Sequence, residues 1–125
     1  MRLDHINIKA PEPLLEQVRA FYCAVFGLQQ GFRPDFSSAG YWLYAQEQPI
    51  VHLSLGGEKP GGARPAYLDH VAFRARGLHA FLARLEEHGV DYRSTEIPDL
   101  GLTQLFFRDP AGTGLEVNFA GEALP

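Results

Sequence analysis

The two halves of the chain resemble each other, and this internal repeat restricts the possible folds more than any other feature of the sequence. Residues 3–8 read LDHINI and residues 68–73 read LDHVAF. Both segments contain β-branched or aromatic residues and few turn formers, which is typical of strands. A repeat on this scale indicates that one structural unit is used twice.

A helical pattern follows each of these predicted strands. Apolar residues recur at the spacing of one helix face and stop before a glycine, Gly27 in the first half and Gly89 in the second. The apolar positions are Leu14, Val18, Phe21, Tyr22 and Val25 in the first helix, and Leu78, Phe81, Leu82 and Leu85 in the second. Each half therefore begins with a strand and a helix.

Three further strands are predicted in each half. They cover about residues 28–33, 40–45 and 49–55 in the first half, and 91–97, 102–108 and 113–119 in the second. The sequence therefore predicts an α+β fold of two βαβββ modules, residues 2–55 and 67–120, within one domain of residues 1–125. Residues 56–66 (GGEKPGGARPA) are rich in Gly and Pro, and we expect them to link the modules.

The predicted strands place four metal-competent side chains on one face. Because successive side chains of a strand point to opposite faces, the apolar residues share one face, which the helices are expected to cover. The polar residues that fall on the other face are His5, His52, His70 and Glu116. In the alignment of the repeat, His5 corresponds to His70 and His52 to Glu116, so each module contributes an equivalent pair.

Three imidazoles and one carboxylate form a ligand set that first-row divalent metals accept. A carboxylate on a half-buried strand also needs a partner, because taking a lone charge out of water is costly. A single strand histidine is more often structural, but four such residues at equivalent positions favour a site. We therefore expect His5, His52, His70 and Glu116 to bind a divalent metal ion (Zn, Ni, Mn or Fe).

The other histidines and the cysteine are weaker candidates. His79 and His88 lie away from the apolar face of the second predicted helix, where a solvated surface explains them. Cys23 is the single cysteine, so no intrachain disulfide can form, and we expect a small buried thiol there. This cysteine usage fits a reducing, cytoplasmic location.

Further observations concern which side chains point toward the cavity. Residues 109–112 (DPAG) are a turn by their chemistry, and we expect the turn to set the last strand so that Glu116 points inward. On the preceding strand, the cavity is faced either by Gln104, Phe106 and Arg108 or by Leu105 and Phe107, and Phe107 favours the core for the second set. Trp42 is equally compatible with the cavity and with the core.

Charge and hydropathy exclude several classes of partner. The formal net charge is −4 and no block of basic residues stands out, so nucleic acid is not an expected partner. No apolar run approaches the roughly 18 residues that a membrane span needs, and the first residues lack the apolar core of a signal peptide.

These segments together resemble the vicinal oxygen chelate superfamily, over about residues 2–120. That superfamily includes glyoxalase I, bleomycin and fosfomycin resistance proteins, extradiol dioxygenases and methylmalonyl-CoA epimerase. The segments that carry the resemblance are residues 3–5, 21–28, 68–73 and 106–117. The resemblance implies paired βαβββ modules that form a U-shaped mixed sheet, helices on its outside, a divalent metal in its cavity, and a homodimer.

The resemblance also implies roles for particular residues. His5, His70 and Glu116 match metal ligands of the family, whereas His52 stands where glyoxalase I has a glutamate. The imidazole of His52 is then either the fourth ligand or a base, since imidazoles titrate near neutral pH. Glu116 and His52 are therefore the catalytic candidates. The metal site forms either within one chain or between the first module of one chain and the second module of another.

Three functions follow from this resemblance. The leading one is a metal-dependent glyoxalase-like enzyme, a lyase or isomerase that moves a proton through a metal-stabilised enediolate on a small carbonyl or thiol-adduct substrate. One alternative is an Fe(II)-dependent extradiol ring-cleaving dioxygenase that uses His5, His70 and Glu116. The other is an antibiotic-resistance protein that sequesters its ligand.

Overall fold

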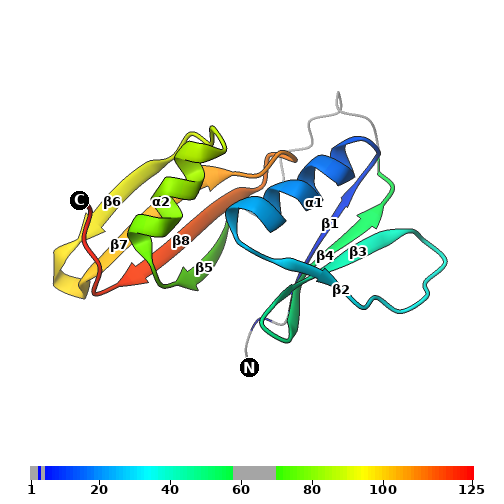
Figure 1. The fold of residues 1–125 in the computed structure, drawn as a ribbon, viewed down its shortest axis with the longest axis horizontal. Helices are drawn as coiled ribbons and strands as arrows, with labels where there is room; N and C mark the ends of the chain where they lie inside the picture. Colours follow the sequence, from blue (N-terminus) through cyan, green and yellow to red (C-terminus); the bar gives the residue numbers. More distant parts are fainter. Residues whose placement is uncertain (1–2, 4, 58–69) are drawn as a thin grey trace. The chain divides into compact units, whose positions relative to one another are not determined.

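The chain divides into two units, Met1–Pro65 and Ala66–Pro125, each built around its own sheet. The computed structural model describes residues 3, 5–57 and 70–125 (Figure 1). The predicted linker at 56–66 falls mostly outside the described residues. None of the helices in the described part of the chain is long and apolar enough to cross a membrane.

The first unit is a mixed four-stranded sheet with one helix. Its elements are β1 (Ile6–Ala10), α1 (Leu14–Val25), β2 (Gln29–Gly31), β3 (Gly40–Ala45) and β4 (Gln48–Leu55). The strand order is β1-β4-β3-β2, with β1 parallel to β4 and the other pairs antiparallel. Figure 1 shows α1 lying across one face of this sheet.

The second unit repeats this arrangement. Its elements are β5 (Val71–Ala75), α2 (Leu78–Glu87), β6 (Arg93–Ile97), a 3₁₀ turn (Pro98–Leu100), β7 (Leu102–Arg108) and β8 (Gly114–Ala120). The strand order β5-β8-β7-β6 and the parallel β5–β8 pair are those of the first unit. The α+β class with two βαβββ modules is therefore confirmed.

Both helices form as predicted, because their apolar residues are spaced to lie on one helix face. In α2 the four predicted apolar residues are all buried, and the chain leaves the helix through Gly89 at a φ of +65°. In α1 the buried residues are Leu15, Val18, Tyr22 and Val25. Leu14 and Phe21, which share the apolar spacing, are only half-buried, because both lie at the edge of the stripe that Val18 and Tyr22 define.

The first strand of each module begins later than predicted. β1 starts at Ile6 and β5 at Val71, so His5 and His70 each lie directly before a strand. Ile6 and Ile8 still share a face, as predicted, and Asn7 lies exposed on the opposite one. The histidines are therefore held at the point where the chain enters the sheet.

The structure resolves which residues of β7 face the core. Leu105 and Phe107 are buried against the helix side, where the ring of Phe107 lies 6.0 Å from that of Phe81 on α2. Gln104 and Phe106 alternate with them and therefore lie on the opposite face. That face is the one that carries Glu116, because Phe106 and Glu116 are paired across β7 and β8.

Asp109 organises the turn that leads into β8. One of its carboxylate oxygens, Oδ1, accepts hydrogen bonds from the backbone N–H groups of Ala111 and Thr113, each at 2.9 Å. Gly112 completes the turn at a φ of +86°, which only glycine adopts readily. Asp109 is 5% exposed, so few water molecules can replace it as an acceptor.

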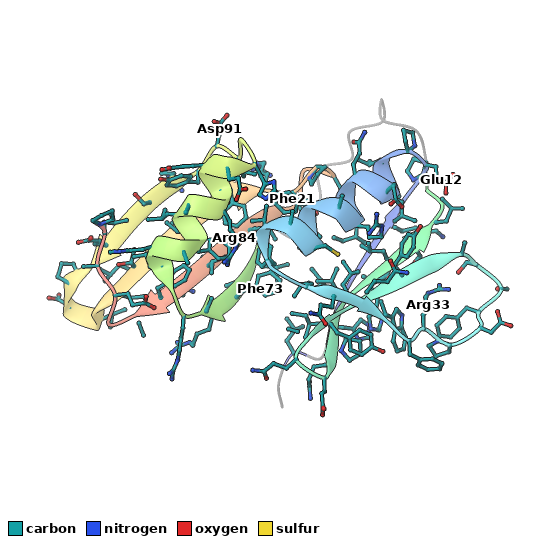
Figure 2. All side chains as sticks on the ribbon, in the orientation of Figure 1. Glu12, Phe21, Arg33, Phe73, Arg84 and Asp91 are labelled. Atoms are coloured by element: carbon teal, nitrogen blue, oxygen red, sulfur yellow. The ribbon has the colours of Figure 1, made fainter. Side chains whose placement is uncertain are left out.

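Replacing Asp109 with alanine is expected to lower the free energy of unfolding by about 1–3 kcal/mol, because two N–H groups lose their acceptor. Chemical denaturation of the variant measures this. Asp91→Ala is the matched control, since Asp91 is exposed on the connection before β6 (Figure 2). Equal stability of the two variants would contradict the assigned role of Asp109.

Candidate functional site

The polar faces of the two sheets carry the predicted residues at equivalent positions. Asn7 pairs with His52 across β1 and β4, and Ala72 pairs with Glu116 across β5 and β8. His5 precedes Asn7 by two residues, as His70 precedes Ala72. The register of the sheets therefore relates the His5–His52 pair to the His70–Glu116 pair.

In the first unit, the two histidines lie in an aromatic stack. The rings of His5 and His52 are 3.8 Å apart between centroids and nearly parallel, with an interplanar angle of 12°. On its other side His52 stacks on Trp42 at 4.1 Å and 13°. Trp42, which the sequence left open, thus lies on the polar face and holds His52 in place.

A backbone contact fixes which nitrogen of His52 carries a proton. Its Nε2 lies 3.1 Å from the carbonyl oxygen of Pro49. A carbonyl only accepts, so Nε2 donates this hydrogen bond and the lone pair of the neutral ring is on Nδ1. A histidine whose second nitrogen is bound to a backbone carbonyl in this way is typical of metal ligands.

In the second unit, Glu116 is a buried carboxylate with two side-chain partners. Its residue is 9% exposed, and its Oε2 lies 3.0 Å from Nε2 of His70. Its Oε1 accepts a hydrogen bond of 2.7 Å from Nε2 of Gln104, which also lies 3.1 Å from Oδ1 of Asn118. These partners compensate for the cost of burying the charge.

Gln104 contacts the candidate residue Glu116, and the sequence did not assign it a role. It belongs to one of the two alternative sets on β7, and the alternation of that strand alone could not decide between them. The apolar character of Leu105 and Phe107 was the available signal, because two large apolar side chains at that spacing favour the core.

The two pairs fit a divalent metal in their chemistry. When two donors bind the same ion at about 2.0–2.2 Å, they lie roughly 3 Å apart. His70 and Glu116 already have that separation, and the imidazole rings of His5 and His52 lie next to each other in their stack. Within the described residues of each unit these side chains come as pairs, and no group of three or more metal-competent side chains is found.

The weaker candidates lie elsewhere. His79 is exposed on α2, with its Nε2 3.2 Å from the carbonyl oxygen of Ala123, and His88 is exposed at the end of that helix. Cys23 is half-buried on α1, so it is less buried than expected. These positions agree with the expectation that neither histidine belongs to the site.

Comparison with known proteins gives a family for this arrangement. The family model described as Glyoxalase/Bleomycin resistance protein/Dioxygenase superfamily matches residues 2–117. The curated protein Glyoxylase I 4 of Arabidopsis thaliana is 26% identical over 122 residues, which cover 92% of this chain and 68% of that protein.

Solved structures share the fold. A putative glyoxalase family protein from Bacillus anthracis has a TM-score of 0.72 at 24% identity, covering 96% of this chain and 95% of that one. A mutant of the fosfomycin resistance protein FosX from Listeria monocytogenes was solved with Mn(II) and 1S,2S-dihydroxypropylphosphonic acid. It has a TM-score of 0.66 at 18% identity and covers 98% of this chain and 94% of that one.

Proposed function

Because this chain belongs to the glyoxalase/bleomycin resistance protein/dioxygenase superfamily, we propose that it is a metal-dependent enzyme of the glyoxalase type. It acts as a lyase or isomerase on a small carbonyl compound or thiol adduct. The observation that carries the proposal is the equivalent register of two donor pairs, His5 with His52 and His70 with Glu116.

The proposed ligands are His5, His52, His70 and Glu116, and the proposed metal is Zn, Ni, Mn or Fe. When bound, such an ion polarises a carbonyl oxygen of the substrate or holds two neighbouring oxygens. The presence of Mn(II) in the structure of FosX supports a divalent metal for this fold. The chemistry of the donors supports the same choice, since imidazole and carboxylate suit these ions.

Glu116 is the proposed proton carrier. Gln104 holds Oε1 and His70 contacts Oε2, so the carboxylate keeps one orientation while it gains or loses a proton. In this role Glu116 takes a proton from the carbon next to the substrate carbonyl and returns it to the neighbouring carbon. Its burial keeps water away from the transferred proton.

His52 is the second residue with a proposed catalytic role. Its Nε2–H is bound to Pro49, so Nδ1 is the atom that binds metal or accepts a proton. The stack between His5 and Trp42 restrains the ring in either case. A restrained imidazole with a defined tautomer can exchange a proton with substrate without first reorienting.

One observation favours a second candidate function. The stack on Trp42 holds the ring of His52 whether or not a metal is bound, which leaves His5, His70 and Glu116 as a two-histidine, one-carboxylate set. That set is typical of non-haem Fe(II) oxygenases, with His52 then acting as a neighbouring acid or base. Oxygen uptake with catechols by the iron-loaded protein would support ring cleavage.

Metal analysis of the protein purified without chelator tests the leading proposal. We expect one divalent ion per site and turnover in a panel of 2-oxoaldehyde thiol adducts. Protein without metal that also fails to bind added Zn, Ni, Mn or Fe would contradict it. Tight capture of a ligand without turnover would instead indicate a sequestering protein.

We further propose a homodimer in which each site takes one donor pair from each chain. Mixing two variants, His5→Ala/His52→Ala and His70→Ala/Glu116→Ala, tests this. In a mixed dimer one site loses all four ligands and the other keeps all four. Since random exchange makes about half of the dimers mixed, the metal content of the mixture should return to about a quarter of that of the unchanged protein. Each variant alone should bind little metal. No recovery in verified mixed dimers would place the site within one chain.

A further inference from the structure

The polar face of the second sheet is rich in positive charge. Glu116 pairs with Phe106 on β7 and Phe106 pairs with Arg93 on β6, so these side chains share one face. By the same alternation, Arg74 and Arg108 lie on that face. Among the described strand residues of this face, Glu116 is the one carboxylate beside three arginines, in a chain of formal charge −4.

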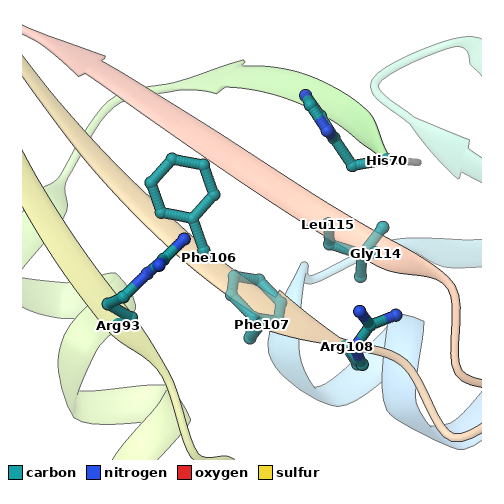
Figure 3. Close-up of a pocket in the computed structure, with 7 residues that line it drawn as sticks. All are labelled: His70, Arg93, Phe106, Phe107, Arg108, Gly114 and Leu115. Carbon is teal, nitrogen blue, oxygen red and sulfur yellow. The ribbon is translucent and has the colours of Figure 1, made fainter.

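A cavity of about 480 Å³ lies where β7 ends and β8 begins, and its lining includes residues of this face together with Phe107 and Leu115 (Figure 3). His70, Arg93, Phe106 and Arg108 are among the residues that line it. Pockets for small molecules usually measure about 300–1,000 Å³, so its volume suits a small ligand. The cavity therefore brings two guanidinium groups into the same space as the histidine that contacts Glu116.

Arg93 is oriented by an aromatic ring. Its guanidinium carbon lies 4.9 Å from the centroid of Phe106, and Figure 3 shows the two side chains next to each other. Stacking on a ring occupies the flat face of a guanidinium and leaves the N–H groups at its edge available. In the described part of the chain no carboxylate forms an ion pair with Arg93.

Arg108 is a diagonal neighbour of Arg93. It lies two residues beyond Phe106, the partner of Arg93, which places the two residues roughly 7–8 Å apart on the same face. One nitrogen of Arg108, Nη1, donates a hydrogen bond of 2.8 Å to the carbonyl oxygen of Gly112. This contact uses one of its donors and anchors the side chain at the edge of the cavity.

The first unit has a different residue at the position of Arg93. There the corresponding row runs from Asn7 through His52 and Trp42 to Gly31. A Cβ atom at Gly31 would lie 2.8 Å from the ring of Tyr44, so that ring already fills the space. The cationic group at this position therefore belongs to the second module alone and is not a consequence of the repeat.

We propose that the substrate carries an oxyanion group, a carboxylate or a phosphonate, which Arg93 binds with Arg108 beside it. This inference rests on the proposed function, since it takes the reacting carbons to lie next to Glu116. Two strand spacings of about 4.8 Å separate the backbones of Glu116 and Arg93. The side chains of Glu116 and Arg93 cover part of that separation, so a small molecule with its anionic group a few bonds from its carbonyl can span the rest.

Anion binding by the full chain tests the proposal independently of activity. Methylphosphonate and propionate are titrated into chelator-treated protein while the Nε–Hε NMR signals of the arginines are followed. We expect saturable shifts at Arg93 and Arg108 with the better probe. Arg93→Gln should weaken its binding by about 10-fold or more, because it removes charged hydrogen bonds, and Arg93→Lys should restore part of it.

Arg84→Gln is the matched control for Arg93→Gln. Arg84 lies on α2 (Figure 2) and also stacks on a phenylalanine, Phe81, at 5.1 Å, so the substitution removes the same charge and the same kind of contact. Equal weakening by both substitutions, or no saturable binding of either probe, would overturn the proposal. Metal content distinguishes failure of this proposal from failure of the proposed function. Arg93→Gln should keep its metal, whereas no metal in any variant would contradict the proposed metal-dependent function.

Discussion

Replacing Glu116 with alanine is expected to lower the affinity for a divalent metal by more than about 100-fold, since losing even an outer partner of a ligand costs about 10- to 100-fold. Turnover should fall at least as far, because the same carboxylate is the proposed proton carrier. Isothermal titration of the chelator-treated protein with Zn, Ni or Mn measures the affinity, and initial rates with a 2-oxoaldehyde thiol adduct measure turnover.

Two further variants make this result specific. Glu116→Gln keeps the volume of the side chain and its contact with Gln104 but removes the charge, so it should also lose most of the metal affinity. Gln104→Leu removes the orienting hydrogen bond to Glu116 and the contact with Asn118 but no proposed ligand, so it should have a smaller effect, about 10- to 100-fold. Glu87→Ala is the control, because Glu87 is exposed on α2.

Thermal unfolding of each variant separates loss of the site from loss of the fold. Glu116→Ala removes a buried charge together with its partners' contacts, so a changed melting temperature alone would not identify a ligand. If the folded Glu116→Ala protein binds metal as tightly as Glu87→Ala does, Glu116 is not a ligand and the proposed site is wrong.

The sequence predicted the modules because two independent patterns agreed, the apolar spacing of the helices and the composition of the strands. Apolar spacing defined both helices, and the strands of 40–45 and 102–108 coincide with β3 and β7. The strand starts were less certain, since residues next to a strand share its apolar pattern whether or not they pair. The start of β1 at Ile6 depends on pairing with Val51, which is a contact between distant segments.

The equivalent positions of the proposed ligands were predictable from the repeat, whereas the side chains that contact them were not. The repeat aligned His52 with Glu116, and the register places both in the same way. The contact from Gln104 to Glu116 depends on which face of β7 meets the helix, and that choice is made by packing. Arg93 lies on a strand that the sequence predicted, but its position beside Phe106 follows from the register of β6 with β7.

Replacing Leu105 with alanine tests that packing directly and is expected to lower the free energy of unfolding by about 2–5 kcal/mol. Leu105 is fully buried on the helix side of β7 and pairs with Val117 on β8. Truncating it leaves a cavity between the sheet and α2. A module of about 60 residues buries a smaller fraction of its surface than a larger domain does, so a loss of this size should remove much of its stability.

Leu100→Ala is the matched control for Leu105→Ala. It makes the same chemical change five residues earlier in the chain, at a side chain that is 69% exposed. Its effect should stay within about 0.5 kcal/mol, as for other surface substitutions. Denaturant titration of both variants gives the comparison. A small loss of stability for Leu105→Ala would mean that the even-numbered residues of β7 face the helix. The two faces of the strand would then be exchanged, and Gln104 could not hold Glu116.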